Sequence, residues 1–136
     1  MTNRYFQLFR VLTSFIFIYA GTNHLLQPGK ILGKVAKGWA YQLLDMPSAF
    51  SVSIGLSGVA MIVFGVLLSI GYKQRLAALV LLAMLIPITL MAQLDNLQDL
   101  GPFFKNVALT GSLIFIINYK AHEVQKPLVR SYGPAR

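Results

Sequence analysis

The chain is a succession of long apolar segments separated by short polar ones. Four segments have the length and composition of helices that cross a membrane: 6–26, 50–70, 76–93 and 103–119. A bilayer core of about 30 Å requires about 20 residues of helix. Continuous apolar runs of this length are typical of helices rather than strands. The sequence therefore predicts an all-α fold, a four-transmembrane-helix bundle in which residues 1–136 form a single integral membrane domain with a polar tail at 120–136.

The first apolar segment carries a stripe of unusual residues. Helical steps of four and three residues align the following side chains on one face: Arg10, Ser14, Phe17, Gly21 and His24. Ionisable residues inside a membrane helix are costly to bury and by default indicate function. At about 1.5 Å per residue, Arg10 and His24 lie roughly 21 Å apart and cannot share one site. We predict that Arg10 anchors the helix at the inner membrane surface and that His24 lies near the outer surface.

The polar connection between the first two apolar segments has a helical pattern of its own. Ile31, Val35 and Trp39 recur at helical spacing, and a row of lysines follows the same period: Lys30, Lys34 and Lys37. This pattern predicts a short amphipathic interfacial helix with the lysines opposite the apolar residues. We expect the lysines and Trp39 to anchor this segment to lipid headgroups.

The lysines and arginines predict the orientation of the bundle. One side holds eight of them, in the N-terminus, the basic turn 71–75 and the tail: Arg4, Arg10, Lys73, Arg75, Lys120, Lys126, Arg130 and Arg136. The other side holds Lys30, Lys34, Lys37 and Lys105. Because the more basic side of a membrane protein faces the cytoplasm, we predict a multi-pass protein of the bacterial inner membrane with both termini cytoplasmic.

Two features of the apolar segments bear on helix packing. Small residues recur in the second segment, among them Gly55, Gly58 and Gly65. Such residues let helix backbones approach closely in lipid, and the pattern favours packing within the bundle over a dimer interface. In the third segment, Pro87 lacks the N–H that would pair with the carbonyl of Ala83, so we predict a kink there.

The composition agrees with a membrane protein. The chain is 56% hydrophobic and 12% charged, against about 25% charged in soluble domains. The net charge of +8 comes from residues at helix ends and in the tail, so we predict no nucleic-acid partner. The absence of cysteine excludes thiolate ligation of zinc or of an iron–sulfur cluster. The two histidines, His24 and His122, fall on opposite membrane sides, and we predict no metal site.

Several polar residues should converge at the outer end of the bundle. The candidate ligand-binding residues are Asn23, His24, Asp95, Asp99, Lys105 and Asn106. A histidine near a carboxylate can exchange a proton or bind the headgroup of a quinone. The alternatives are that His24 caps its helix, that the two aspartates are a solvated loop, and that Lys105 is an interface anchor. No motif identifies a catalytic residue.

These residues together resemble a known family. The resemblance rests on Arg10, the run Ala20-Gly21-Thr22-Asn23-His24-Leu25, Pro28, Gly58, Gly65, Arg75, and the run Phe103-Phe104-Lys105-Asn106-Val107-Ala108-Leu109-Thr110-Gly111. Over residues 4–119 the chain resembles the DoxX / DoxX-like family of small four-helix membrane proteins. Some relatives carry a glutamate where this chain has Met61, which argues against a carboxylate site inside the bundle.

The resemblance has functional implications. It implies an accessory subunit of a quinone-linked membrane redox assembly, with quinone as a ligand, no covalently bound cofactor, and no catalysis required of this chain. The positions that match are the His24 region and Lys105-Asn106. One alternative is a quinone- or lipid-binding enzyme component with a site at the outer face. Another is a small-solute carrier acting as an oligomer. The expected partners are the lipid bilayer and either other subunits or further copies of this chain.

Overall fold

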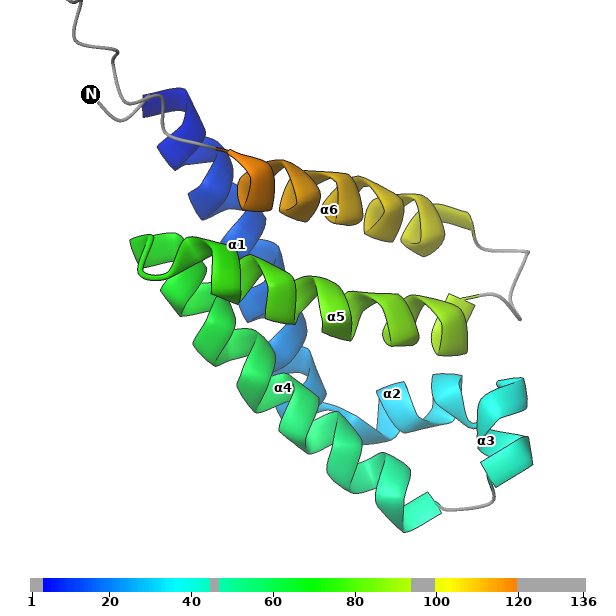
Figure 1. The fold of residues 1–136 in the computed structure, drawn as a ribbon. Coiled ribbons are helices and arrows are strands. Elements are labelled where there is room, and N and C mark those ends of the chain that lie inside the picture. The colour runs from blue at the N-terminus through cyan, green and yellow to red at the C-terminus, as the bar shows by residue number, and fades with distance from the viewer. Residues whose placement is uncertain (1–3, 45–46, 94–99, 120–136) are drawn as a thin grey trace, which may run out of the picture.

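Helices make up almost all of the structure. The computed structural model describes residues 4–44, 47–93 and 100–119, and these residues contain no strand. The six helices are α1 (Arg4–Leu26), α2 (Pro28–Val35), α3 (Trp39–Leu44), α4 (Pro47–Ile70), α5 (Gln74–Gln93) and α6 (Leu100–Asn118), shown in Figure 1. The prediction of an all-α fold is confirmed, and the four apolar segments correspond to α1, α4, α5 and α6. Asp45, Asp95, Asp99 and the tail lie outside the described residues.

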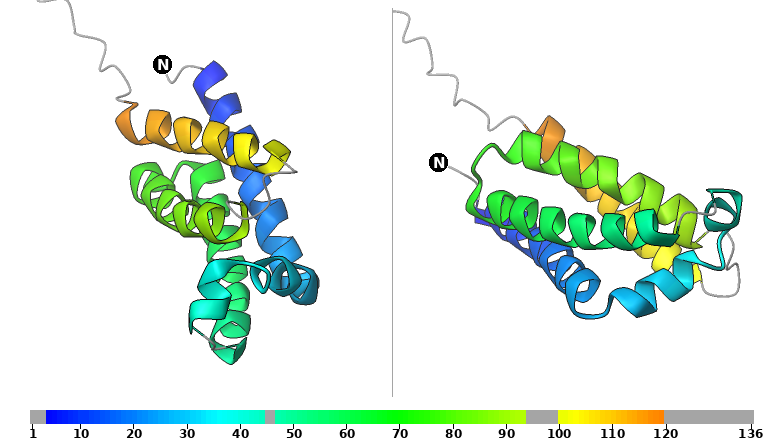
Figure 2. Two further views of the ribbon diagram at one scale, coloured as in Figure 1. Left: turned by 90° about the vertical axis from the view of Figure 1, so that its right-hand side faces the viewer. Right: turned by 90° about the horizontal axis from the view of Figure 1, so that it is seen from below.

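The four long helices form two antiparallel pairs. α1 packs mainly against α4, and α5 packs mainly against α6. Figure 1 shows α4 and α5 diverging from their shared turn, with α2 and α3 at the wide end; Figure 2 shows the same arrangement from two other sides. At the turn end, the ring of Phe6 on α1 stacks on that of Tyr119, just after α6, with ring centres 3.7 Å apart. The beginning of α1 and the end of α6 therefore lie at the same end of the bundle as the α4–α5 turn.

The segment between α1 and α4 differs from its predicted form. One amphipathic helix was expected, whereas the structure contains two short helices separated at residues 36–38. α2 begins with Pro28, which has the φ of a first helical turn and no N–H to leave unpaired. The Gly38 N–H bonds the Val35 carbonyl over 2.9 Å in a tight turn, and glycine weakens a helix at such a position. Trp39 therefore begins α3 instead of continuing α2.

Glycines bring the backbones of α1 and α4 into direct contact. A Cβ added at Gly21 would lie 2.6 Å from the Gly58 carbonyl oxygen, and one added at Gly65 would lie 2.8 Å from Ile18 Cγ1. Both distances are too short for a real side chain. The prediction that Gly58 and Gly65 pack within the bundle is confirmed, whereas a Cβ at Gly55 would have no neighbour within 4 Å.

A single register describes the whole α1–α4 contact. Three pairs mark it: Arg10 with Ser69, Ser14 with Gly65, and Gly21 with Gly58. Each step along α1 is matched by an equal step back along α4, as expected for antiparallel helices. The predicted stripe on α1 is the face that makes this contact, since Ser14, Phe17, Gly21 and His24 are all buried.

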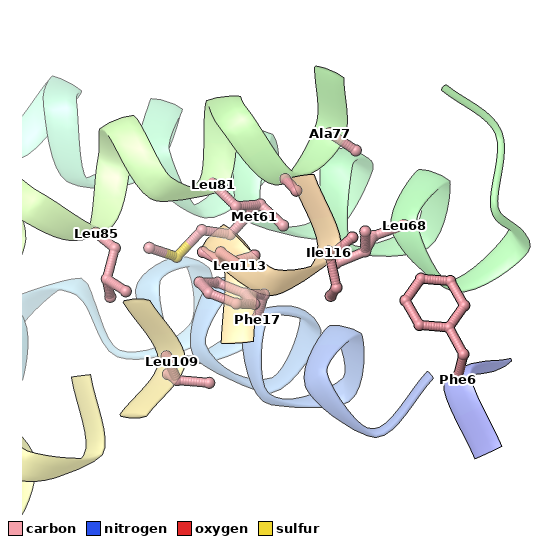
Figure 3. Packing of buried hydrophobic residues seen from close by; sticks show 11 residues of the cluster. Phe6, Phe17, Met61, Leu68, Ala77, Leu81, Leu85, Leu109, Leu113 and Ile116 are labelled. Carbon is pink, nitrogen blue, oxygen red and sulfur yellow. The ribbon is translucent and has the colours of Figure 1, made fainter. Parts of the chain in front are cut away.

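The apolar core lies where the two helix pairs meet. Figure 3 shows side chains from α1, α4, α5 and α6 packed together. The fully buried large side chains include Phe17, Leu68, Leu81, Leu113 and Ile116. Met61 is also buried in this cluster, at 3% exposure.

The outer surface of the bundle is apolar, and α1 shows this most clearly. Its outward stripe consists of Leu8, Leu12, Phe15 and Tyr19, which are between 57% and 70% exposed. Its buried face combines the apolar Phe6 and Phe17 with Thr13, Ser14, Gly21 and His24. A surface helix of a soluble protein would instead turn its polar residues outward.

Two described helices have the length and composition to cross a membrane: Ser48–Ile70 and Leu100–Asn118, with mean hydropathies of 2.2 and 1.6. Only 28% and 22% of their most apolar windows are buried, so neither is enclosed like a core helix of a soluble protein. The apolar stretch of α5, Gln74–Leu90, is shorter. α1 does not meet the same criterion.

Candidate functional site: a cavity at the wide end of the bundle

A cavity of about 690 Å³ lies between the two helix pairs at the end where α2 is found. Its walls come from the last turns of α1, the first half of α4, the second half of α5, and α2, with Lys105 contributed by α6. The cavity is of the size that holds small organic ligands. It forms because α4 and α5 diverge from their turn and because α2 crosses the opening (Figure 1).

The polar part of the lining is rich in hydrogen-bond donors. Its neutral members are Tyr19, Asn23, His24, Gln27, Ser53 and Ser57. Its charged members are Lys30 and Lys34 from α2 and Lys105 from α6. The cavity can therefore bind a polar headgroup through several donors at once.

His24 is held in place by a hydroxyl of α4. Its Nδ1 lies 2.9 Å from Ser57 Oγ, and the Ser57 hydroxyl donates to the Ile54 carbonyl over 2.8 Å. Since the serine proton is used in that bond, Ser57 accepts from His24 Nδ1–H. This tautomer, inferred from the network, leaves Nε2 as an acceptor. The serine proton is directed away from the imidazole, so the pair orients His24 and does not activate a nucleophile.

The remaining lining is apolar. It consists of Ala20, Ile31, Val35, Phe50, Ile54, Ala83, Met84, Pro87 and Ile88. Pro87 lies inside α5 and has no N–H, so the carbonyl of Ala83 lacks its usual helical donor. Both residues line the cavity, which places a weakened point of the α5 backbone beside it. A mixed lining of this kind suits an amphiphile, with one polar and one apolar part.

The structure brings together some of the residues predicted for the outer site. Asn23, His24 and Lys105 all line the cavity. Asn106 does not: it is buried between α5 and α6, where its Nδ2 donates to Thr89 Oγ1 over 2.9 Å. The predicted contributions of Asp95 and Asp99 lie outside the described residues.

The predicted membrane anchors divide in the same way. Lys30 and Lys34 line the cavity together with Ile31 and Val35, whereas Lys37 and Trp39 are exposed and are not in its lining. The lysine row and the apolar row were expected on opposite faces of one helix. In α2, Lys30 and Lys34 from the lysine row and Ile31 and Val35 from the apolar row all line the same cavity.

Arg10, predicted as an anchor at the inner surface, contacts the α4–α5 turn. Its Nη1 donates to Gln74 Oε1 over 2.9 Å and its Nη2 to the Ser69 carbonyl over 3.3 Å. The guanidinium lies against Gly71, whose φ of +86° is the left-handed conformation that glycine adopts freely. Arg10 thus joins α1 to the turn, at the opposite end of α1 from His24. Its role toward lipid stays a prediction.

Sequence reasoning missed several residues of the cavity. In the sequence, Tyr19 and Phe50 occupy ordinary apolar positions. Ser57 is one of several small residues that predict helix packing. One feature of the sequence does indicate the site: Pro87, which frees the carbonyl of Ala83. It marks an unusual position in α5 but does not indicate which other residues lie beside it. Among residues 4–44, 47–93 and 100–119, no three His, Cys, Asp or Glu side chains gather where they could hold a metal ion.

Comparison with known proteins adds one finding. The family model described as DoxX matches residues 6–94, which is more than half of the chain. The match includes α1 to α5, with every described helix that lines the cavity except α6, and ends before Lys105 and Asn106. No curated protein and no solved structure matches the chain significantly.

Proposed function

The chain belongs to the DoxX family, and from this premise we propose that it is an integral membrane protein with four spanning helices, α1, α4, α5 and α6. α4 and α6 have the required length and hydropathy. The outward apolar stripe of α1, with Thr13, Ser14 and His24 turned inward, supports the same role for α1. Polar groups that are turned inward, among them Thr13, Ser14 and His24, lower its mean hydropathy while they stay buried.

We further propose that the protein binds an amphiphile, with the polar headgroup beside His24 and the apolar part along α5. The observation that carries this proposal is the cavity of about 690 Å³, whose lining combines polar side chains from α1, α2 and α4 with Ala83, Met84, Pro87 and Ile88 from α5. It lies at the end of α1 that the charge pattern assigns to the outer membrane face. A quinone or a lipid has the required two-part chemistry.

The resemblance to DoxX-like proteins supports a redox setting for this binding. In that setting the chain is an accessory subunit of a quinone-linked membrane assembly. His24, held through Nδ1 by Ser57, presents Nε2 as an acceptor, and such a nitrogen can receive a hydrogen bond from a hydroquinone hydroxyl. This chain then binds and orients the headgroup, and partner subunits carry out electron transfer.

Filling the cavity tests the binding proposal. Ala83→Trp would occupy the apolar wall, whereas Ala108→Trp adds the same bulk at an exposed position of α6 that is not in the lining. Native mass spectrometry and solvent extraction of the detergent-purified proteins would measure bound quinone and lipid. We expect the wild type and Ala108→Trp to retain an amphiphile and Ala83→Trp to lose most of it. Equal retention by all three proteins would refute the proposal.

The absence of cysteine makes the four-span topology simple to test. Single cysteines at Lys37 and Lys73 should lie on opposite sides of the membrane, because α4 separates them. A membrane-impermeant maleimide applied to intact spheroplasts should label Lys37→Cys and leave Lys73→Cys unlabelled until the membrane is opened. Labelling of both cysteines in intact spheroplasts would contradict the proposed topology.

A further inference from the structure

We infer that the headgroup bound in this cavity is negatively charged, and specifically that it is the phosphate of an anionic phospholipid. This inference rests on the proposed binding of an amphiphile and, of the two candidate ligands, assigns a lipid rather than a quinone to the cavity. It comes from the way separate elements of the fold bring cationic side chains to one cavity.

Three lysines line the cavity. Lys30 and Lys34 lie one turn apart on α2, and Lys105 comes from the beginning of α6. These two elements are far apart in the sequence, so the convergence is a product of the fold. None of the described lining residues is acidic.

Such a cluster favours an anion for a simple electrostatic reason. Like charges around one cavity repel each other, and the repulsion grows as the surrounding dielectric constant falls toward that of a membrane. A phosphate between the lysines replaces repulsion with attraction. The first turn of α2 also lies at the wall, through Lys30 and Ile31, and a helix N-terminus carries partial positive charge.

The rest of the lining indicates a lipid rather than a free anion. The apolar part of the lining includes Phe50, Met84 and Ile88, which a free phosphate would leave without a partner. An acyl chain would cover these side chains. A neutral headgroup, in contrast, would leave the three lysines without a counter-charge among the described lining residues.

Matched lipids and matched variants test the inference. Detergent-purified protein would be mixed with phosphatidylglycerol or phosphatidylcholine of identical acyl chains, and separately with inorganic phosphate, and bound species would be counted by native mass spectrometry. Since each lysine near an anionic headgroup contributes roughly fivefold to binding, the triple variant K30Q/K34Q/K105Q should bind phosphatidylglycerol at least tenfold more weakly. The control R4Q/K73Q/R75Q loses the same charge at exposed positions outside the lining and should keep the wild-type preference.

The outcomes separate this inference from the proposed function. Loss of the phosphatidylglycerol preference in K30Q/K34Q/K105Q alone supports it. Equal binding of the two lipids by the wild type, or equal loss in both triple variants, overturns the inference while amphiphile binding stands. Displacement of phosphatidylglycerol by millimolar inorganic phosphate shows a free-anion site and overturns the assignment to a lipid. If neither lipid binds and no quinone is retained, the proposed function fails as well.

Discussion

The two helix pairs of the bundle are held together in different ways. α1 and α4 meet backbone to backbone, because Gly21, Gly58 and Gly65 leave no room for side chains between them. α5 and α6 meet through larger side chains and one buried polar pair, Asn106 with Thr89. The first contact fixes the spacing of its helices closely, whereas the second depends on side chains that can repack.

This difference bears on the candidate site. The wall that carries His24 and Ser57 belongs to the tightly packed pair, so the position of the imidazole is well defined. The opposite wall belongs to α5, where Pro87 interrupts the backbone hydrogen bonds. A rigid polar wall that faces a more adaptable apolar wall suits a ligand with one defined headgroup and a variable chain.

The largest expected effect follows from adding a methyl group inside the α1–α4 contact. Gly21→Ala places a Cβ against the Gly58 carbonyl oxygen, and the two backbones must separate. We expect a loss of about 3 kcal/mol in the free energy of unfolding, at the upper end for overpacked cores. Thermal unfolding in detergent, followed by circular dichroism, measures it. Gly55→Ala is the matched control, because its Cβ meets nothing within 4 Å, and it should be neutral or slightly stabilising.

A smaller loss of stability is expected from a substitution where α1 meets the α4–α5 turn. Arg10→Met removes the hydrogen bonds to Gln74 and to the Ser69 carbonyl while keeping most of the side-chain bulk. Since hydrogen bonds of charged donors contribute about 2 kcal/mol, we expect a loss of that size in chemical denaturation. Arg75→Met, at an exposed position of α5, should change stability little. Equal effects of the two variants would mean that Arg10 acts through charge alone.

The smallest loss of stability is expected from a substitution in the α5–α6 contact. Asn106→Ala removes one hydrogen bond to Thr89, which keeps its own bond to the Leu85 carbonyl. Polar pairs between membrane helices contribute about 0.6 kcal/mol on average, so we expect a loss near 1 kcal/mol and unchanged amphiphile retention. Asn118→Ala, at an exposed position, serves as control. Reduced retention in Asn106→Ala alone would return Asn106 to the binding site, as the sequence suggested.

The sequence predicted the helices well and the site only in part. The length of the apolar runs was enough to predict the four long helices. Periodicity was enough to predict the buried face of α1, because burial of a helix face depends on spacing along one segment. The break between α2 and α3 was missed, since the short helix depends on a local turn at Gly38 whose bonds are visible only in three dimensions. Asn106 was grouped with His24 by depth in the membrane, which specifies height along the bundle but not the direction of a side chain.

What the sequence determined by itself was the four long helices and the stripe from Arg10 to His24. Both are properties of single helices, fixed by hydrophobicity and by a period of 3.6 residues. Only the tertiary structure decided that Arg10 joins the α4–α5 turn, that Ser57 orients His24, and that Lys30, Lys34 and Lys105 share one cavity. These contacts depend on how far α4 and α5 diverge and where α2 crosses, which packing between helices sets and no single segment encodes.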